Sequence, residues 1–333
     1  MTIQEIAQAI VAPGKGILAA DESTPTIGKR LAGIGVENTE DNRRAYRELL
    51  FTTDNMSEYI SGVIMYDETL RQNGSDGSKL VEVLEKQGVF SGIKVDMGVE
   101  PLQDGSEEKI TNGLDGLEER LKEYYELGAR FAKWRAVITI GENMPTDECI
   151  SKNAKRLAKY AKLVQDAGMV PIVEPEILMD GDHDIDRCYE VTTNTLHSVF
   201  EELYAHDVEL DGMLLKPNMV IPGKGSGKAS SEIIAQKTID CFHKSVPPKT
   251  AGIVFLSGGQ SEQEACENLD AMNRLDIEKP WELSFSYGRA LQSSVLQAWL
   301  GKSENINAAK EAFLKRSKLT SAARSGTYNS DME

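Results

Sequence analysis

A lysine closes the apolar run GMLLK at 212–216, and a proline follows it directly. A lysine at the end of a buried strand has two possible arrangements. Its alkyl stem can extend so that the ammonium group reaches water, or the side chain can stay buried as a neutral amine. A neutral lysine amine attacks a ketone, and the resulting Schiff base acts as an electron sink while a carbon–carbon bond breaks. The run alone favours a solvent-exposed Lys216, because lysine is rarely buried. The other charged residues of the chain therefore have to decide between the two interpretations.

Similar short apolar runs elsewhere in the chain also end in charged side chains. These residues are Asp21, Lys94, Lys133, Arg135, Glu174, Glu176 and Lys216. Lys133 and Arg135 are two residues apart, so in a strand they point to the same side. Buried charges are costly unless they are paired or used in chemistry. Lysines, arginines and carboxylates at converging strand ends therefore indicate a site for an anionic substrate.

This grouping gives Lys216 a chemical context. Positive neighbours and partial burial both lower a lysine pKa, which favours the nucleophilic amine. Glu174 is expected to donate and accept the protons needed to form and dehydrate a carbinolamine. Asp21 is expected to manage a proton on a substrate hydroxyl. This chemistry requires neither a metal nor another cofactor.

Two glycine-containing turns are candidate phosphate sites. LSGGQS at 256–261 places Ser257 and Gly258 between a strand and a serine-capped helix start, where bare backbone N–H groups bind anions. SYGRAL at 286–291 is a second such turn, with Ser286 before the glycine and Arg289 able to grip a phosphate in a fork. Each turn alone is also typical of a purely structural connection. Together they predict a phosphate site after the last two strands.

These side chains need a fold that gathers strand ends at one place. Eight short apolar runs alternate with amphipathic helical stretches, among them 115–128, 152–168, 230–246 and 261–275. The runs lie at 16–20, 59–65, 91–95, 131–137, 170–174, 212–216, 252–257 and 281–286. The alternation predicts an α/β fold, a (β/α)8 TIM barrel, with residues 1–333 as a single domain. The rival, an open doubly wound sheet, requires a glycine-rich turn after the first strand, where the chain reads DESTP.

The remaining motifs indicate neither a metal nor a nucleotide. The four histidines lack the spacing of metal ligands. PGKGSGKAS at 222–230 resembles a P-loop, but Pro222 occupies the first glycine position and Ala229 the Ser/Thr position. The acidic segment around His183 is interpreted as a solvated loop, because the spacing of a calcium-binding loop is absent. We therefore expect no metal and no cofactor.

The composition of the chain limits its expected binding partners and cellular compartment. Lys and Arg number 37 against 53 Asp and Glu, a formal charge of −16, which argues against nucleic acid or an anionic membrane as partner. No segment reaches the roughly 20 apolar residues of a membrane span. The first residues lack a signal-peptide pattern, and four scattered cysteines are typical of a reducing compartment. We expect a cytoplasmic protein.

A series of longer motifs carries a family resemblance over about residues 10–300. They are GILAADEST, GIKVD, FAKWR, PIVEPEI, LLKPNMV, FLSGGQS and SYGRALQ, in the order of that family. The chain resembles class I fructose-1,6-bisphosphate aldolase. The resemblance implies a (β/α)8 barrel, usually a homotetramer, that acts in glycolysis and gluconeogenesis. It cleaves fructose 1,6-bisphosphate to dihydroxyacetone phosphate and glyceraldehyde 3-phosphate without a metal.

The resemblance also implies roles for individual residues. Lys216 matches the Schiff-base lysine, Glu174 matches the acid/base beside it, and Glu176 supports the site. Asp21 matches the residue that handles the hydroxyl proton lost during cleavage, and Lys133 matches the residue that keeps the pKa of the Schiff-base lysine low. The matches to substrate- and phosphate-binding positions are Ser23, Thr26, Lys94, Arg135, Ser257, Gly258 and Arg289.

The C-terminal end departs from the family pattern. Animal members end in a long mobile tail whose last residue, a tyrosine, shuttles the proton on the ketone half. This chain has a short tail, about residues 317–333, in which Tyr328 is the only tyrosine and is not terminal. Tyr328 is therefore a candidate proton shuttle, and the alternatives are another group or water.

Other functions stay open at this point. A different Schiff-base lyase, acting on a monophosphate or a keto acid, would use much of the same machinery. Sedoheptulose 1,7-bisphosphate is a plausible second substrate, and a catalytically silent barrel serving as a scaffold is an alternative of another class. The intact set of Asp21, Lys133, Glu174 and Lys216 argues against the scaffold. A plastid form without its transit peptide would have much the same sequence.

Overall fold

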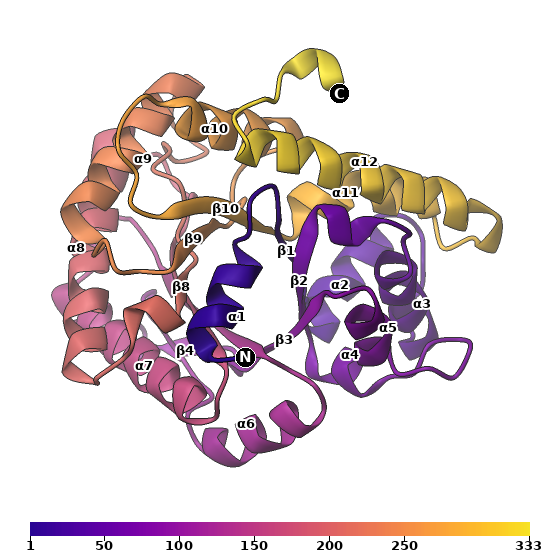
Figure 1. The fold of residues 1–333 in the computed structure, drawn as a ribbon. Coiled ribbons are helices and arrows are strands. Elements are labelled where there is room, and N and C mark those ends of the chain that lie inside the picture. Colours follow the sequence, from indigo (N-terminus) through magenta and orange to yellow (C-terminus); the bar gives the residue numbers. More distant parts are fainter.

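The chain folds into a closed barrel of eight parallel strands surrounded by helices (Figure 1). The computed structural model describes residues 1–333. The strands are β1 (Gly16–Ala20), β2 (Ile60–Met65), β3 (Phe90–Lys94), β6 (Phe131–Ile138), β7 (Val170–Ile177), β8 (Leu214–Leu215), β9 (Gly252–Phe255) and β10 (Glu282–Tyr287). They follow one another around the barrel in the order β1-β10-β9-β8-β7-β6-β3-β2. Each strand overlaps one predicted apolar run, so the predicted (β/α)8 barrel is confirmed.

The strands are buried on both faces, as their flat hydrophobicity predicts. Inside the barrel the ring of Phe131 occupies space that a glycine leaves, since a Cβ at Gly92 would lie 2.2 Å from that ring. The short helix α1 (Ile3–Ile10) lies across one end of the barrel in Figure 1. Its Ile6 and Ile10 belong to the same apolar cluster as Phe131. This end is closed, and the C-terminal ends of the strands face the opposite side.

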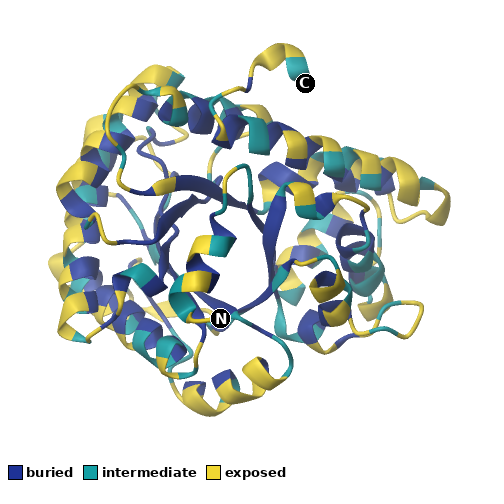
Figure 2. Cartoon of the chain, in the orientation of Figure 1, coloured by how far each residue is buried: buried dark blue, intermediate teal, exposed yellow.

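Helices connect the strands and cover the outside of the barrel. They are α2 (Thr24–Ala32), α3 (Glu40–Phe51), α4 (Asp67–Arg71), α5 (Leu80–Lys86), α6 (Leu117–Glu126), α7 (Asp147–Asp166), α8 (Ile185–Ala205), α9 (Ser231–Ser245), α10 (Glu262–Arg274), α11 (Arg289–Trp299) and α12 (Ile306–Arg324). Figure 2 shows their buried faces turned toward the strands and their exposed faces outward. The four predicted helical stretches correspond to α6, α7, α9 and α10. None of the helices has the length and apolar character needed to cross a membrane.

Two features of the connections were not predicted. The segment after β3 forms an antiparallel hairpin of β4 (Val99–Pro101) and β5 (Lys109–Thr111) before α6 begins. Strand β8 is reduced to two residues, yet the backbone N–H of Lys216 still donates to the Val173 carbonyl at 2.8 Å. That bond fixes the backbone of Lys216 beside the middle of β7.

The C-terminal tail is shorter than the predicted 317–333. Helix α12 continues to Arg324, because Leu319, Thr320 and Ala323 are buried on its inner face. The tail therefore begins at Ser325, and in Figure 1 it lies beside α10 and α12. The boundary at 317 is corrected by this burial, which keeps the helix intact for two further turns.

Candidate active site

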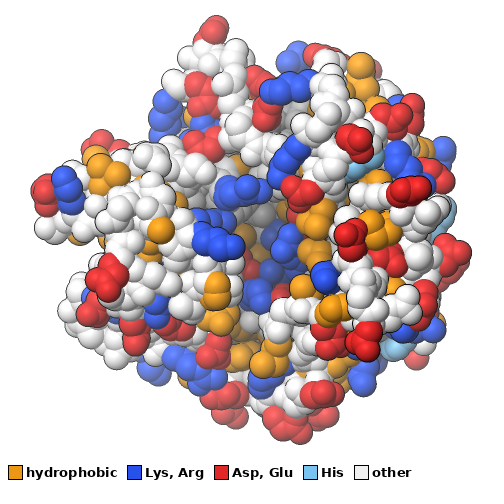
Figure 3. All heavy atoms as spheres, turned by 180° about the vertical axis from the view of Figure 1, so that it is seen from behind, with side chains coloured by type: hydrophobic (Ala, Val, Ile, Leu, Met, Phe, Trp, Pro, Cys, Tyr) orange, Lys and Arg blue, Asp and Glu red, His pale blue; other side chains and the backbone are white.

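A cavity of about 1000 Å³ opens at the C-terminal ends of the strands. Figure 3 shows a hollow with Lys and Arg side chains around it, on a face that also carries many acidic residues. The cavity is lined by Asp21, Ser23, Thr26, Lys94, Lys133, Arg135, Glu174, Glu176, Lys216, Ser257, Gly258, Ser286 and Arg289. These are all of the predicted catalytic and binding residues except Tyr328. The barrel therefore brings residues that are far apart in the sequence to one place.

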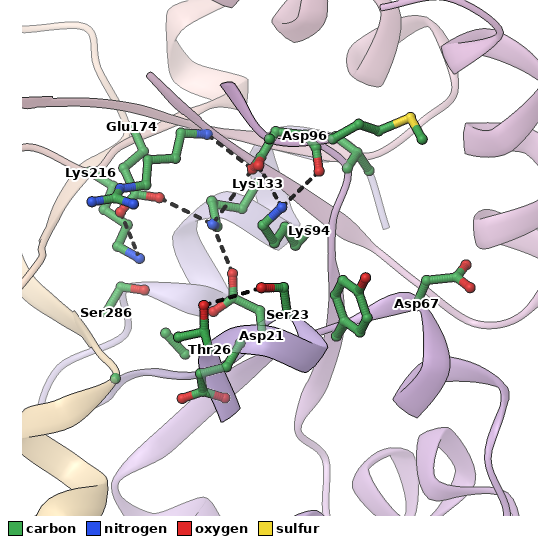
Figure 4. A pocket seen from close by; sticks show the side chains of 18 of the residues that line it. Asp21, Ser23, Thr26, Asp67, Lys94, Asp96, Lys133, Glu174, Lys216 and Ser286 are labelled. Atoms are coloured by element: carbon green, nitrogen blue, oxygen red, sulfur yellow. Dashed lines mark hydrogen bonds and ion pairs between the residues drawn. The ribbon is translucent and has the colours of Figure 1, made fainter. Parts of the chain in front are cut away.

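Lys133 is buried and lies at the centre of three carboxylates, those of Asp21, Asp96 and Glu174 (Figure 4). Its Nζ is 2.8 Å from Asp21 Oδ2, 3.4 Å from Glu174 Oε2 and 3.8 Å from Asp96 Oδ2. Burial opposes the charged form of a lysine. Here the carboxylates outweigh burial and raise the pKa of Lys133 well above its ordinary value. The charged form of Lys133 is consequently favoured, and a protonated amine is not a nucleophile.

Asp21 forms the shortest ion pair with Lys133 in this cluster. Burial favours the neutral form of its carboxyl, but the nearby Lys133 and Lys216 hold the pKa of Asp21 well below its usual range. Asp21 follows β1 directly, so the strand fixes where its side chain enters the cavity. The carboxylate is ionised at neutral pH and accepts hydrogen bonds only.

Lys216 is 4 % exposed and lies beside Glu174, with 3.2 Å between its Nζ and Glu174 Oε1. Glu174 thus uses one carboxylate oxygen for Lys216 and the other for Lys133. Figure 4 also places Ser286 close to Lys216. The Ser286 hydroxyl is buried at the cavity and has no hydrogen-bond partner in the protein. It is therefore free to bind a ligand beside Lys216.

Asp96 belongs to this site although it was not predicted. Lys94 donates to the Asp96 carbonyl oxygen at 2.7 Å and is also paired with its carboxylate. The same carboxylate accepts the backbone N–H of Arg135 at 3.3 Å. The signal was present in GIKVD, because Asp96 follows Lys94 by two residues and so falls on the same side of an extended segment.

Arg135 and Glu176 form an ion pair on the adjacent wall. Burial opposes the pKa rise of Arg135, but the carboxylates of Glu176 and Glu174 outweigh it and hold the pKa above its ordinary value. Glu176 also approaches the glycine turn, since a Cβ at Gly258 would lie 2.9 Å from its Oε1. A side chain at Gly258 would therefore disturb both the turn and the Arg135 ion pair.

The two predicted phosphate turns stand next to each other. The turn at Ser257 and Gly258 leads into the N-terminus of α10, and Arg289 is the first residue of α11. Gly259 has a φ of +80°, a conformation that favours glycine. Strands β9 and β10 are neighbours in the barrel, so both helix N-termini reach the same side of the cavity. Backbone N–H groups, the helix dipoles and one guanidinium are thus available to an anion there.

A second set of polar side chains lies near the N-terminus of α2. The Ser23 hydroxyl is 3.1 Å from Thr26 Oγ1, and Ser23 makes no side-chain cap to the helix. Arg30, from the last turn of α2, also lines the cavity and pairs with Glu22. Arg30 was missed because a basic residue near a helix C-terminus is ordinary and gives no signal of a site.

Tyr328 is not part of this cavity. Its hydroxyl donates to Glu333 Oε1 at 2.8 Å, and its backbone N–H donates to Asp270 Oδ1 at 2.9 Å. It lines a separate cavity beside α9 and α10. The structure therefore separates the proposed proton shuttle from the other candidate residues. No group of three or more His, Cys, Asp or Glu side chains is arranged to hold a metal ion.

Comparisons with known proteins all point to the same family. The family model described as fructose-bisphosphate aldolase class-I matches residues 2–333. The chain is 57 % identical over 319 residues to the cytosolic fructose-bisphosphate aldolase 6 of Arabidopsis thaliana, covering 96 % of this chain and 89 % of the relative. It is 54 % identical to a fructose-bisphosphate aldolase of Drosophila melanogaster, with 98 % and 91 % covered.

A solved structure supports the same relationship. The fructose-bisphosphate aldolase of Plasmodium falciparum, crystallised with TRAP and a small-molecule inhibitor, is 49 % identical to this chain with a TM-score of 0.97. The match covers 98 % of this chain and 95 % of the crystallised one. From its sequence, its barrel and its relatives alike, the chain belongs to the class I fructose-bisphosphate aldolase family.

Proposed function

We propose that this cavity cleaves fructose 1,6-bisphosphate through a Schiff base on Lys216. The class I family uses a lysine Schiff base and no metal. The observation that carries the assignment is the position of Glu174, whose two oxygens face two buried lysines at 3.2 and 3.4 Å. Three carboxylates surround Lys133, whereas Glu174 is the one carboxylate paired with Lys216. A lysine nucleophile needs one such partner with which to exchange protons.

Lys216 and Glu174 form the Schiff base in this proposal, and other groups handle the later proton transfers. Glu174 accepts the proton of the Lys216 ammonium, and the neutral amine attacks the ketone carbon of the substrate. Glu174 then returns a proton to the carbinolamine hydroxyl, which leaves as water and yields the iminium. The electron pair of the C3–C4 bond moves into the iminium as the C4 hydroxyl loses its proton and becomes an aldehyde. Protonation of the enamine and hydrolysis of the iminium release dihydroxyacetone phosphate and restore Lys216.

Asp21 and Lys133 serve the bond-breaking step in this proposal. The ionised Asp21 carboxylate accepts a hydrogen bond from the C4 hydroxyl and receives its proton as the aldehyde forms. The positive charge of Lys133 stabilises the carboxylates around it while protons move. Because Tyr328 is held outside the cavity, the proton taken up by the enamine comes from water or another cavity group.

The two predicted phosphate-binding sets of residues support a bisphosphate as the substrate. Ser257, Gly258, Ser286 and Arg289 are assigned to the phosphate on the ketone half, beside Lys216. Ser23, Thr26 and Lys94 are assigned to the other phosphate, and the Arg135–Glu176 pair to the sugar between them. We also propose sedoheptulose 1,7-bisphosphate as a second substrate, because it too carries a phosphate at each end and differs only in chain length. Cleavage of fructose 1-phosphate with no activity on the bisphosphate would contradict this assignment.

The cellular form of the enzyme is also a proposal. A homotetramer is favoured because members of this family are usually tetrameric, and light scattering on an eluting size-exclusion peak tests it.

We place the protein in the cytoplasm, since several relatives with more than half of their residues identical are named cytosolic or cytoplasmic isozymes.

Borohydride trapping tests the mechanism directly. The protein is incubated with dihydroxyacetone phosphate in excess EDTA, reduced with borohydride, and digested for peptide mass spectrometry. We expect a reduced adduct on Lys216, and none on the same peptide of Lys216→Met. The assignment would be overturned if the reduced adduct were found on Lys133. It would also be overturned if EDTA abolished cleavage and Lys216 stayed unmodified.

A further inference from the structure

The C-terminal residue is bound to the body of the protein. Glu333 accepts a hydrogen bond from the Tyr328 hydroxyl and forms an ion pair with Arg316 of α12. Arg316 is itself 4 % exposed, so its guanidinium lies among α10, α12 and the tail with little access to water. Removing one partner of a nearly buried ion pair is costly, because it leaves the other charge uncompensated. The pair with Arg316 therefore anchors Glu333, and with it the tail, to α12.

Arg316 connects this anchor to the start of α10. Its second terminal nitrogen donates to the Glu262 backbone carbonyl at 3.2 Å, and its Nε lies 4.0 Å from Glu262 Oε2. The other carboxylate oxygen of Glu262 accepts from Ser294 of α11, from the backbone N–H at 3.0 Å and from the hydroxyl at 3.1 Å. A continuous polar chain thus runs from Glu333 through Arg316 and Glu262 to Ser294.

This chain ends on the two helices that begin at the phosphate turns. Glu262 is the first residue of α10, four residues after Gly258, and Arg289 is the first residue of α11. A helix moves as a rigid element, so its orientation determines where its N-terminal N–H groups and first side chains point. Whatever holds α10 against α11 also sets the distance between the two turns of the cavity.

We propose that Glu333 is a positioning residue for the ketone-half phosphate site, acting through Arg316 and Glu262 on the relative placement of α10 and α11. The proposal rests on the assignment of Ser257, Gly258 and Arg289 to that phosphate. The tail of this chain then contributes to substrate binding from outside the cavity. It does so without a side chain that touches the substrate.

Steady-state kinetics of Glu333→Gln test this placement. The variant removes the charge that holds Arg316 but keeps the size of the side chain. Because both fructose 1,6-bisphosphate and fructose 1-phosphate carry the ketone-half phosphate, we expect KM for both to rise by the same factor, roughly three- to tenfold, with kcat changed less than about twofold. The matched control is Asp331→Asn, which removes a charge from the same exposed tail at a side chain with no ion pair. It should leave both KM values unchanged.

The outcomes separate this proposal from the function itself. If Glu333→Gln and Asp331→Asn give the same KM values while the wild type cleaves both substrates, the positioning role is wrong and the function stands. A fall in kcat at constant KM would also overturn it, because the tail would then act on the chemistry. If the wild type cleaves neither sugar phosphate, the proposed function fails first.

A double-mutant cycle tests the route through α11. Ser294→Ala removes one of the two bonds that Glu262 accepts, at a residue outside the cavity. If the chain transmits the effect, the KM increase of the double variant is smaller than the product of the two single increases. Independent, multiplying effects would show that Glu333 does not act through Glu262.

Discussion

At the scale of single residues, Lys133 and Lys216 share one carboxylate and differ in the rest of their surroundings. Three acids converge on Lys133, whereas Glu174 is the one acid paired with Lys216. The carboxylates around Lys133 raise its pKa against the effect of burial. This lysine therefore neutralises the acids of the site, while its neighbour is placed to exchange a proton with Glu174.

Replacing the central lysine should cost both activity and stability. Lys133→Met leaves three carboxylates facing one another, so we expect kcat to fall by about 10²–10³-fold and the free energy of unfolding by about 3 kcal/mol. Lys133→Arg keeps the charge and should recover part of the stability. Steady-state rates and urea unfolding measure the two effects. Full activity in Lys133→Met would show that the cluster has no role in catalysis.

The low pKa of Asp21 predicts a pH dependence of stability with a definite sign. Since its pKa is lowered in the folded state from an ordinary 3.8, the unfolded chain binds more protons in that range. The stabilisation by Asp21 is therefore present above about pH 4 and is lost as the pH falls toward the folded-state pKa. The stability difference between wild type and Asp21→Asn should shrink on acidification. Urea midpoints of the two proteins between about pH 3 and pH 7 measure it, and a difference that stays constant over this range would contradict the prediction.

The residues of the site could be predicted from the sequence more fully than their contacts. Charged residues at strand ends converge in any parallel barrel, so Lys94, Glu174 and Lys216 followed from the pattern of runs alone. Which acid pairs with which lysine depends on strand register and rotamers, which no local spacing fixes. The division of Glu174 between two lysines was missed for this reason, whereas Asp96 could have been found from its spacing of two residues from Lys94.

At the scale of elements, burial decided which segments were predictable. Strands buried on both faces are continuous apolar runs, and all eight were found. The β4–β5 hairpin was not, because β4 is exposed along its whole length and has no hydrophobic pattern. The start of the tail was misplaced for a related reason, since α12 buries small and polar residues such as Ser317 and Thr320. These give little amphipathic signal.

The packing of β3 against β6 gives a prediction at this scale. The ring of Phe131 fills the space beside Gly92, where an added Cβ would lie 2.2 Å away. Gly92→Ala should therefore destabilise the protein by about 1–3 kcal/mol, the usual cost of overpacking a core. Thermal unfolding measures this. The control is Gly227→Ala, a loop position where an added Cβ meets no atom within 4 Å and which should change the melting temperature little.

At the scale of the whole molecule, the barrel places the two proposed phosphate sites on opposite sides of one cavity. Strand β9, which leads to Ser257, lies across the barrel from β3, which ends in Lys94. The chain as a whole carries a formal charge of −16, yet cations converge where these strands end. Under the proposed assignment, a substrate with a phosphate at each end spans the cavity, whereas a monophosphate engages only one side.

This separation predicts that one substitution will distinguish two substrates. Lys94→Met removes a cation from the far phosphate site, so kcat/KM for fructose 1,6-bisphosphate should fall by about 10- to 100-fold, the range for a hydrogen bond to a charged group. Fructose 1-phosphate has no phosphate at that end, and its kcat/KM should change less than about threefold. Arg289→Met is the matched change on the opposite side and should weaken both substrates. The substitution also removes the ion pair between Lys94 and Asp96, which is part of the cluster around Lys133. If Lys94→Met lowers kcat/KM equally for the two substrates, Lys94 supports that cluster and does not bind a phosphate.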